Sequence, residues 1–158
     1  MIAEAKAKGL WLALAESLTG GALSAEIVSE PGASEVFLGS VVSYQDQVKS
    51  QLLGASAQLI ASQSAVDPEV AIQMAVGARE KLARACQIDY EWVIGVSTTG
   101  VAGPDPVGSK GPGEVYIGVS SRRGERVYAE RFEGDRNQIR VAAVRRAMEI
   151  IGDEIAGL

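Results

Sequence analysis

The segment AESLTGG (15–21) combines residue types that can attack a substrate and hold a ligand. It follows a continuous apolar run, LWLALA (10–15), which predicts a buried strand, and its two glycines open a predicted helix. Open α/β sheets bind ligands beyond the carboxyl ends of strands, where a helix N-terminus offers unpaired N–H groups. Ser17 is therefore a candidate nucleophile, although a mere helix cap at Ser17 or Thr19 fits this segment equally well. Glu16 fits three roles: binding substrate, orienting a lysine, or standing as a solvated charge.

The lack of histidine restricts the chemistry available to such a serine. The chain has no histidine and one cysteine, Cys86. A Ser-His-Asp or Cys-His mechanism within one chain is therefore excluded, and no metal site is expected. A general base must come from Lys, Tyr, Asp, Glu or a water that they hold. Tyr44 and Lys49 in SYQDQVK (43–49) are candidates, and an exposed lysine beside a half-buried tyrosine is the competing interpretation of this spacing.

A glycine-rich segment offers backbone groups for a polar ligand. Residues 99–113 contain five glycines and three prolines after a predicted strand, which indicates a loop that a ligand can approach closely. The stretch from Gly103 to Lys110 is not a P-loop, because Ser109 separates the second glycine from the lysine and no helix follows.

A pair of arginines opens the last predicted helix. Arg136 and Arg140 in GDRNQIR (134–140) are four residues apart and share one helix face. Arginine pairs suit the recognition of phosphate or carboxylate groups. Solvated surface charge is the alternative interpretation, and it is the one that we prefer for Arg145 and Arg146.

Hydrophobic periodicity and turn residues predict alternating strands and helices. Strands are expected at 10–15, 39–44, 92–98, 114–121 and 125–132, and helices at 2–8, 19–29, 47–53, 68–86 and 136–155. Asp46, Asp67 and Asp135 are expected to cap the last three helices. The final two strands form a predicted hairpin, so the sheet is mixed rather than wholly parallel. The predicted fold class is therefore α/β, a three-layer α/β/α sandwich with a mixed five-stranded sheet, in a single domain over residues 1–158.

The overall composition limits the partners and the location of the protein. A net charge of -5 over 158 residues disfavours binding to phosphate backbones, so no nucleic-acid partner is expected. No apolar run approaches the roughly 20 residues that span a bilayer, and the N-terminus lacks an apolar secretion segment. One cysteine fits a reducing compartment, so we predict a cytoplasmic protein with no membrane partner. Cys86 itself is expected to be a small core residue.

Seven motifs occur in order along nearly the whole chain: AESLTGG (15–21), PGAS-x-VF-x-G (31–39), V-x-SY-x4-K (42–49), LLG (52–54), AV-x-PEVA (65–71), TGVAGPD (99–105) and GDR-x3-R (134–140). Together they resemble the CinA C-terminal domain family, also called competence-damage-inducible proteins, whose stand-alone members include nicotinamide-nucleotide amidase. The resemblance implies an α/β/α protein that hydrolyses nicotinamide mononucleotide to nicotinate mononucleotide and ammonia, without a metal or other cofactor. It also implies a small-molecule nucleotide as ligand and a homodimer or higher homo-oligomer.

The resemblance further implies roles for particular residues. The family's catalytic serine, tyrosine and lysine correspond to Ser17, Tyr44 and Lys49. We expect Lys49, aided by Tyr44, to take the proton from Ser17, which attacks the carboxamide carbon and forms an acyl-enzyme. N–H groups around residues 19–21 are expected to stabilise the oxyanion. Substrate-binding residues are implied at Thr19, Gly20, Gly21, Gly100, Ala102, Gly103, Pro104, Asp105 and Arg136. Glu16 is a further substrate-binding candidate because it directly precedes Ser17.

Departures from the family pattern leave an alternative open. Leu18 stands where a cysteine is common, and its side chain is expected to pack inward. Pro106 follows GPD where glycine is typical, and PGE (112–114) stands where VGT is common. Because these two changes alter a ligand loop, a non-hydrolytic nucleotide-binding module of the same fold is the alternative. A DNA-repair or competence partner is suggested only by the family's name, and the acidic charge argues against it.

Overall fold

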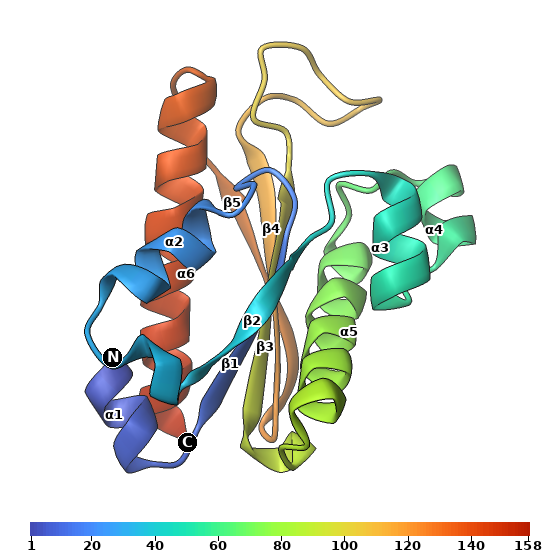
Figure 1. The fold of residues 1–158 in the computed structure, drawn as a ribbon. Coiled ribbons are helices and arrows are strands. Elements are labelled where there is room, and N and C mark those ends of the chain that lie inside the picture. The colour runs from blue at the N-terminus through green and yellow to red at the C-terminus, as the bar shows by residue number, and fades with distance from the viewer.

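Five strands form one sheet in the computed structural model, which describes residues 1–158 (Figure 1). The strands are β1 (Trp11–Glu16), β2 (Phe37–Val42), β3 (Val93–Gly100), β4 (Glu114–Ser121) and β5 (Gly124–Arg131). Their order across the sheet is β2-β1-β3-β4-β5. β2, β1 and β3 are parallel, whereas β4 is antiparallel to β3, and β5 is antiparallel to β4. The predicted mixed sheet is thus confirmed.

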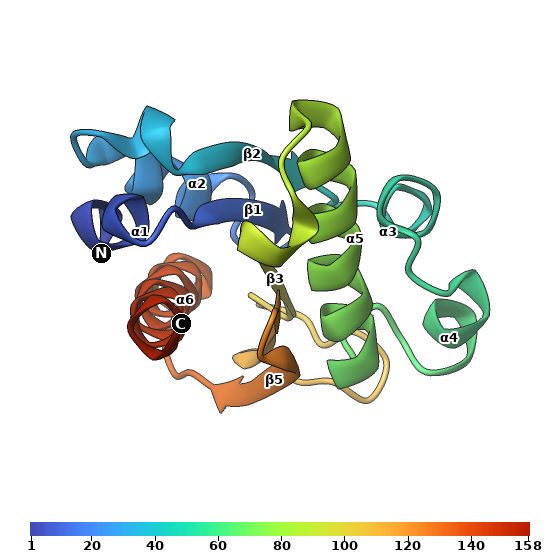
Figure 2. The same ribbon diagram turned by 90° about the horizontal axis from the view of Figure 1, so that it is seen from below.

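Six α-helices cover the two faces of this sheet (Figure 2). They are α1 (Ile2–Ala7), α2 (Ala22–Ser29), α3 (Asp46–Leu53), α4 (Ala57–Ser62), α5 (Pro68–Cys86) and α6 (Arg136–Gly157). α1, α2 and α6 lie on one face, and α5 lies on the other with α3 and α4 outside it. This arrangement is the three-layer α/β/α sandwich that the sequence predicts. None of the six helices combines the length and the apolar character needed to cross a bilayer.

The alternation of side chains along β1 divides the core between the two faces of the sheet. Leu12 and Leu14 join the larger apolar cluster, to which α1, α2 and α6 contribute. Ala13 and Ala15 belong to two smaller clusters that include residues of α5. Both faces of β1 are therefore buried, which explains why its sequence is a continuous apolar run rather than an alternating one.

Glycines let α5 approach the sheet closely. A Cβ atom on Gly95 of β3 would lie 2.2 Å from the carbonyl oxygen of Ala75, and one on Gly118 of β4 would lie 2.3 Å from that of Ala71. Both distances are shorter than any van der Waals contact, so a side chain at either position would push the helix away. The close contact holds α5 against β3 and β4.

The predicted caps are found at two of the three helices. Asp67 accepts hydrogen bonds from two amides in the first turn of α5. Asp135 forms a capping box at the start of α6. The prediction for Asp46 is wrong, because α3 begins at Asp46 itself and its carboxylate accepts a hydrogen bond from Lys49 instead.

Other local predictions are corrected by the structure. β2 ends at Val42, so Tyr44 lies in the connection to α3 rather than at a strand end. α2 begins at Ala22, later than predicted, and α4 is not predicted from the sequence. Cys86 is exposed rather than part of the core. Leu18 packs inward as expected, with 4% of its surface exposed.

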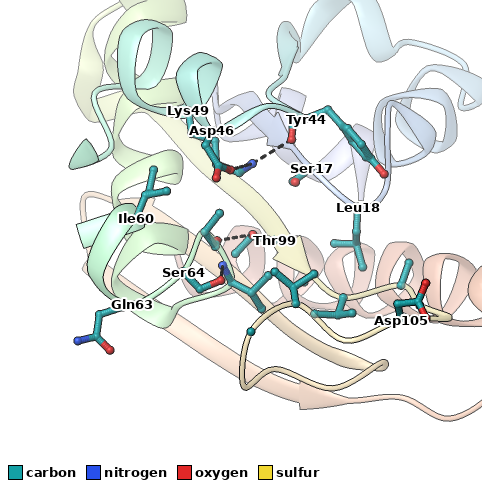
Figure 3. Close-up of a pocket in the computed structure, with 18 of the residues that line it drawn as sticks. Ser17, Leu18, Tyr44, Asp46, Lys49, Ile60, Gln63, Ser64, Thr99 and Asp105 are labelled. Carbon is teal, nitrogen blue, oxygen red and sulfur yellow. Dashed lines mark hydrogen bonds and ion pairs between the residues drawn. The ribbon is translucent and has the colours of Figure 1, made fainter. Parts of the chain in front are cut away.

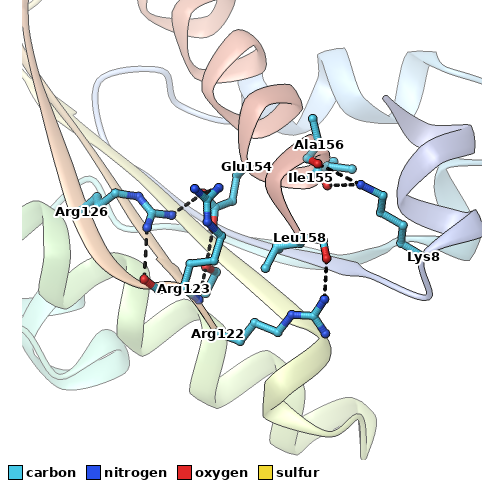
Figure 4. Close-up of polar contacts among 9 residues, drawn as sticks. Lys8, Arg122, Arg123, Arg126, Glu154, Ile155, Ala156 and Leu158 are labelled. Carbon is cyan, nitrogen blue, oxygen red and sulfur yellow. Dashed lines mark hydrogen bonds and ion pairs between the residues drawn. The ribbon is translucent and has the colours of Figure 1, made fainter.

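Charged groups tie the C-terminal end of α6 to the β4–β5 hairpin (Figure 4). Glu154 is buried in α6 and accepts hydrogen bonds from three hairpin side chains, those of Ser121, Arg123 and Arg126. Arg122 donates to the carbonyl of Leu158 at 2.7 Å, and Lys8 donates to that of Ile155 at 2.8 Å. These contacts pair a buried charge and fix α6, whose N-terminal end lies at the opposite edge of the sheet.

Candidate active site

A cavity of about 490 Å³ opens at the carboxyl ends of β1 and β3 (Figure 3). Its volume falls within the range of roughly 300–1,000 Å³ that is typical of small-molecule sites. The lining residues are Ser17, Leu18, Tyr44, Asp46, Lys49, the run Ile60–Val66, the run Thr99–Gly103, Asp105, Val107, Gly108 and Arg136. Segments far apart in the sequence thus meet at the edge of the sheet where open α/β folds bind their ligands.

Ser17 lies directly beyond the end of β1, in the turn that leads to α2. Its amide donates to the carbonyl of Thr98 at 2.9 Å, and its carbonyl accepts from the amide of Gly20 at 3.1 Å. These bonds fix the backbone, whereas Ser17 Oγ makes no hydrogen bond with the residues that line the cavity. The hydroxyl group is therefore free to react with a ligand in the cavity.

Lys49 is a buried lysine on α3, with only 2% of its surface exposed. Its Nζ donates to the carbonyl of Tyr44 and to the carboxylate of Asp46, both at 3.2 Å. A buried amine needs such partners because its loss of water is costly. Figure 3 shows Lys49 and Ser17 at the same cavity, with no hydrogen bond between them. Contacts between a base and its proton donor are often loose before substrate binds.

The phenol of Tyr44 points away from Lys49 (Figure 3). It is exposed, and its hydroxyl accepts a hydrogen bond from Arg136 Nη2 at 2.9 Å. Arg136 Nη1 donates to the carbonyl of Gly103 at 2.6 Å. Arg136 thus links the β2–α3 connection to the glycine-rich loop. Because Tyr44 contacts Lys49 only through its backbone carbonyl, the expected help of the phenol in proton transfer does not match this arrangement.

The carboxylate of Glu16 is buried at the start of α2. It is 0% exposed, and it accepts hydrogen bonds from three hydroxyls, those of Thr19, Ser24 and Ser40, and from three amides, those of Gly21, Leu23 and Ser24. Glu16 therefore caps α2 from the preceding strand, where a negative charge favours the helix N-terminus. Thr19 is also 0% exposed, and its hydroxyl contacts that of Thr98. Neither side chain lines the cavity, so their predicted contact with substrate does not match their placement.

The structure brings most, but not all, of the predicted site residues to the cavity. Those that line it are Ser17, Tyr44, Lys49, Gly100, Ala102, Gly103, Asp105 and Arg136. Those that do not are Glu16, Thr19, Gly20, Gly21 and Pro104. The amides of Gly20 and Gly21 already donate within the turn. The amides of Leu18 and Thr19 make no hydrogen bond within the chain. Because Leu18 lines the cavity and Thr19 does not, the amide of Leu18 is the better candidate for binding an oxyanion.

One wall of the cavity was missed by the sequence analysis. It is the run Ile60–Val66, which comprises the end of α4 and the connection to α5. Thr99 Oγ1 donates to the carbonyl of Ala65 at 2.7 Å and ties this run to the end of β3. The motif AV-x-PEVA (65–71), which overlaps the run, is the signal that could have found it. Asp46 also lines the cavity. The sequence predicted only a helix cap at Asp46, so its place at the site was not expected.

A charged cluster fixes the base of the glycine-rich loop. Lys110 Nζ lies 2.9 Å from the carboxylate of Glu114 and 3.1 Å from the hydroxyl of Tyr116. The hydrogen bond to Glu114, and then that to Tyr116, raise the pKa of Lys110. The hydrogen bond from Lys110 also lowers the pKa of Glu114. Neither Lys110 nor Glu114 lines the cavity, whose charged side chains are those of Asp46, Lys49, Asp105 and Arg136. No three His, Cys, Asp or Glu side chains are grouped so as to hold a metal ion.

Related sequences cover nearly all of this chain. The CinA C-terminal domain model matches residues 1–155. A CinA-like protein from Frankia casuarinae is 40% identical over 93% of this chain, and a putative competence-damage inducible protein from Halothermothrix orenii is 42% identical over 84% of it. The matched regions are 32% and 31% of those proteins, so this chain spans about a third of their length.

Solved structures share the fold. A CinA superfamily protein from Klebsiella pneumoniae is 28% identical, with a TM-score of 0.87 over 99% of this chain and 94% of that one. A competence/damage inducible protein from Agrobacterium tumefaciens is 29% identical, with a TM-score of 0.83 over 95% of this chain and 88% of that one. The sequence motifs and the architecture agree with these likenesses. The chain belongs to the CinA C-terminal domain family.

Proposed function

We propose that this chain is an amidase that hydrolyses nicotinamide mononucleotide to nicotinate mononucleotide and ammonia. The observation that carries the proposal is a free Ser17 hydroxyl in the same cavity as the buried amine of Lys49. A serine nucleophile needs a nearby base, and this chain has no histidine to supply one. The nucleotide substrate is that of nicotinamide-nucleotide amidase, which the ordered motifs of this chain resemble.

The proposed reaction has two acyl-transfer steps. Lys49 accepts the proton of Ser17 as Oγ bonds to the carboxamide carbon, which gives a tetrahedral oxyanion. Lys49 then gives the proton to the leaving nitrogen, the C–N bond breaks, and ammonia departs from an ester on Ser17. Water attacks the ester and passes a proton to Lys49. Cleavage of the ester returns this proton to the Ser17 oxygen and frees the carboxylic acid, which loses its remaining proton to solvent and becomes the carboxylate product.

The contacts of Lys49 define what must change when substrate binds. The amine has to be neutral to accept a proton, and its Nζ has to turn from Asp46 towards Ser17. The free amide of Leu18 directly follows the nucleophile at the cavity, where it would donate to the oxyanion. Arg136 and the backbone of 100–105 would hold the phosphate and the ribose, because they line the same cavity.

A nucleotide-binding module without hydrolysis is the second candidate. One observation favours it: Lys49 is paired with Asp46 and makes no hydrogen bond with Ser17. In that arrangement the cavity holds a ligand, but its lysine accepts no proton.

Ammonia release from nicotinamide mononucleotide separates the two candidates. Wild type, Ser17→Ala and Lys49→Met are compared, with calorimetry to record nucleotide binding and thermal unfolding to verify the fold. The amidase proposal predicts ammonia from wild type and background release from both variants. Lys81→Met, which changes an exposed lysine of α5, is the matched control and should keep wild-type activity. Folded wild type that binds the nucleotide but releases no ammonia would overturn the amidase proposal in favour of the binding module.

A further inference from the structure

Arg140 joins the turn that carries Ser17 to α6 through backbone contacts. Its Nε donates to the carbonyl of Leu18 and its Nη2 to the carbonyl of Thr19, both at 3.0 Å. The carbonyl of Ser17 is held by the amide of Gly20. All three carbonyls of the turn are therefore fixed, two of them by a charged donor.

The planarity of the peptide bond transmits these contacts to the amides. In a trans peptide unit the C=O and N–H bonds point in opposite directions. Arg140 holds the carbonyl of Thr19, and the N–H of Gly20, in the same peptide unit, donates to the carbonyl of Ser17. That carbonyl shares its peptide unit with the N–H of Leu18, which has no partner within the chain and belongs to a residue that lines the active-site cavity. The charged donor at Thr19 also polarises these hydrogen-bonded peptide units and strengthens the N–H of Leu18 as a donor.

The position of Arg140 argues against direct contact with substrate. Arg140 does not line the active-site cavity. It lines a groove between α2 and α6 that also contains Glu26, whose carboxylate would repel a phosphate. Arg136, one helical turn earlier, does line the active-site cavity. The two arginines of the GDR-x3-R motif therefore have different surroundings.

We propose that Arg140 is a positioning residue, which sets the amide of Leu18, through the hydrogen bonds of the turn, as an oxyanion donor for the reaction of Ser17. The inference rests on the proposed amidase function. It differs from both interpretations that the sequence pattern left open for Arg140, recognition of an anionic ligand and solvated surface charge. Loss of Arg140 should slow formation of the charged intermediate and leave nucleotide binding almost unchanged.

The test compares Arg140→Met and Arg140→Lys with Arg145→Met in steady-state release of ammonia from nicotinamide mononucleotide. Methionine keeps an extended side chain but donates no hydrogen bond, whereas lysine keeps the charge. We expect kcat to fall about tenfold to a hundredfold in Arg140→Met with KM within about twofold of wild type, and an intermediate kcat in Arg140→Lys. Arg145 is exposed on the same helix, so its variant should match wild type.

Chemical rescue separates positioning from a general loss of fold. Arg140→Ala is assayed with and without millimolar guanidinium ion, which should enter the vacated space and restore part of kcat without changing the wild-type rate. Thermal unfolding verifies that each variant is folded. If Arg140→Met does not fold, the kcat and KM of Arg140→Lys are compared with those of wild type instead. Wild-type kcat in folded Arg140→Met, or a rise in KM alone, overturns the role of Arg140 and leaves the amidase proposal standing. Wild type that releases no ammonia overturns both.

Discussion

At the scale of single residues, Lys49 and Tyr44 make different contributions although both belong to one short motif. Lys49 is buried and shares the cavity with the free hydroxyl of Ser17. Tyr44 holds Nζ of Lys49 through its backbone carbonyl, while its phenol bonds to Arg136. A backbone contact survives replacement of the side chain. Substitutions at the two positions should therefore have unequal effects.

Tyr44→Phe is expected to lower kcat by less than about tenfold, whereas Lys49→Met should lower it by about a hundredfold or more. Phenylalanine removes only the hydroxyl that bonds to Arg136, and the carbonyl contact with Lys49 remains. Because that hydroxyl helps to fix Arg136, a moderate rise in KM is expected. Steady-state ammonia release measures both variants. An equal loss of kcat in the two would place the phenol in the proton transfer and contradict this division of roles.

At the scale of elements, the start of α2 depends on the buried carboxylate of Glu16. Glu16→Gln keeps the size of the side chain but replaces an accepting oxygen with an NH₂ group, so amides that face it lose their partner. The free energy of unfolding should fall by about 1–3 kcal/mol, as measured by urea denaturation. Glu26→Gln, on the exposed face of the same helix, should change it by less than about 0.5 kcal/mol. Equal stability of Glu16→Gln and wild type would contradict the capping role.

The glycine-rich loop should respond to pH through Lys110 and Glu114. The pKa of Glu114 is lowered in the folded protein, so its contribution to stability is present above the unfolded pKa of about 4.3 and is lost as pH falls through the folded pKa. The pKa of Lys110 is raised, so its contribution is present below about pH 10.4 and is lost as pH rises through the folded pKa.

The Lys110–Glu114 ion pair should contribute little to the free energy of unfolding, because solvent screens its charges. The two side chains are 23% and 21% exposed, and Lys110→Met should therefore lose less than about 1 kcal/mol at neutral pH. Denaturant titrations at neutral and acidic pH measure the deficit, which is the free energy of unfolding that Lys110→Met loses relative to wild type. The deficit should shrink in acid, where Glu114 is protonated in both proteins. A deficit that is constant with pH would show that the ion pair is not its cause.

The helices and strands were predicted well where the residues that fix their ends lie close to them in the chain. α5 and α6 begin directly after the predicted caps Asp67 and Asp135, and β4 covers the predicted range 114–121. The start of α2 was placed too early because its cap is Glu16, a residue of the preceding strand. Patterns of helix caps describe adjacent residues, so they do not reveal a carboxylate that folds back from a strand.

The site was predictable only in part, for a similar reason. The motifs marked Ser17 and Lys49, and the chain topology brings both to one edge of the sheet. The wall at residues 60–66 was missed because its place depends on the hydrogen bond between Thr99 and Ala65, which lie far apart in the sequence. The free amides were misassigned because hydrogen bonds within the turn decide which N–H groups remain available.

At the scale of the whole molecule, the three layers depend on the close contact between α5 and the sheet. Gly95→Ala would place a Cβ atom 2.2 Å from the carbonyl oxygen of Ala75, and the resulting shift should destabilise the fold by about 1–3 kcal/mol. Gly152→Ala in α6 is the matched control, because a Cβ there meets nothing within 4 Å. That variant should gain up to about 1 kcal/mol from better helix propensity. Thermal unfolding measures both, and a stable Gly95→Ala variant would contradict the packing described here.

Interception by hydroxylamine is the most direct test of acyl transfer through Ser17. Wild type and Ser17→Ala are incubated with nicotinamide mononucleotide and hydroxylamine, and mass spectrometry measures the hydroxamate of nicotinate mononucleotide while ammonia is assayed in parallel. Because hydroxylamine competes with water for an ester, wild type should form hydroxamate and Ser17→Ala should form none above the enzyme-free background. Ammonia release by wild type without hydroxamate, or hydroxamate formation by Ser17→Ala, would contradict Ser17 as the nucleophile.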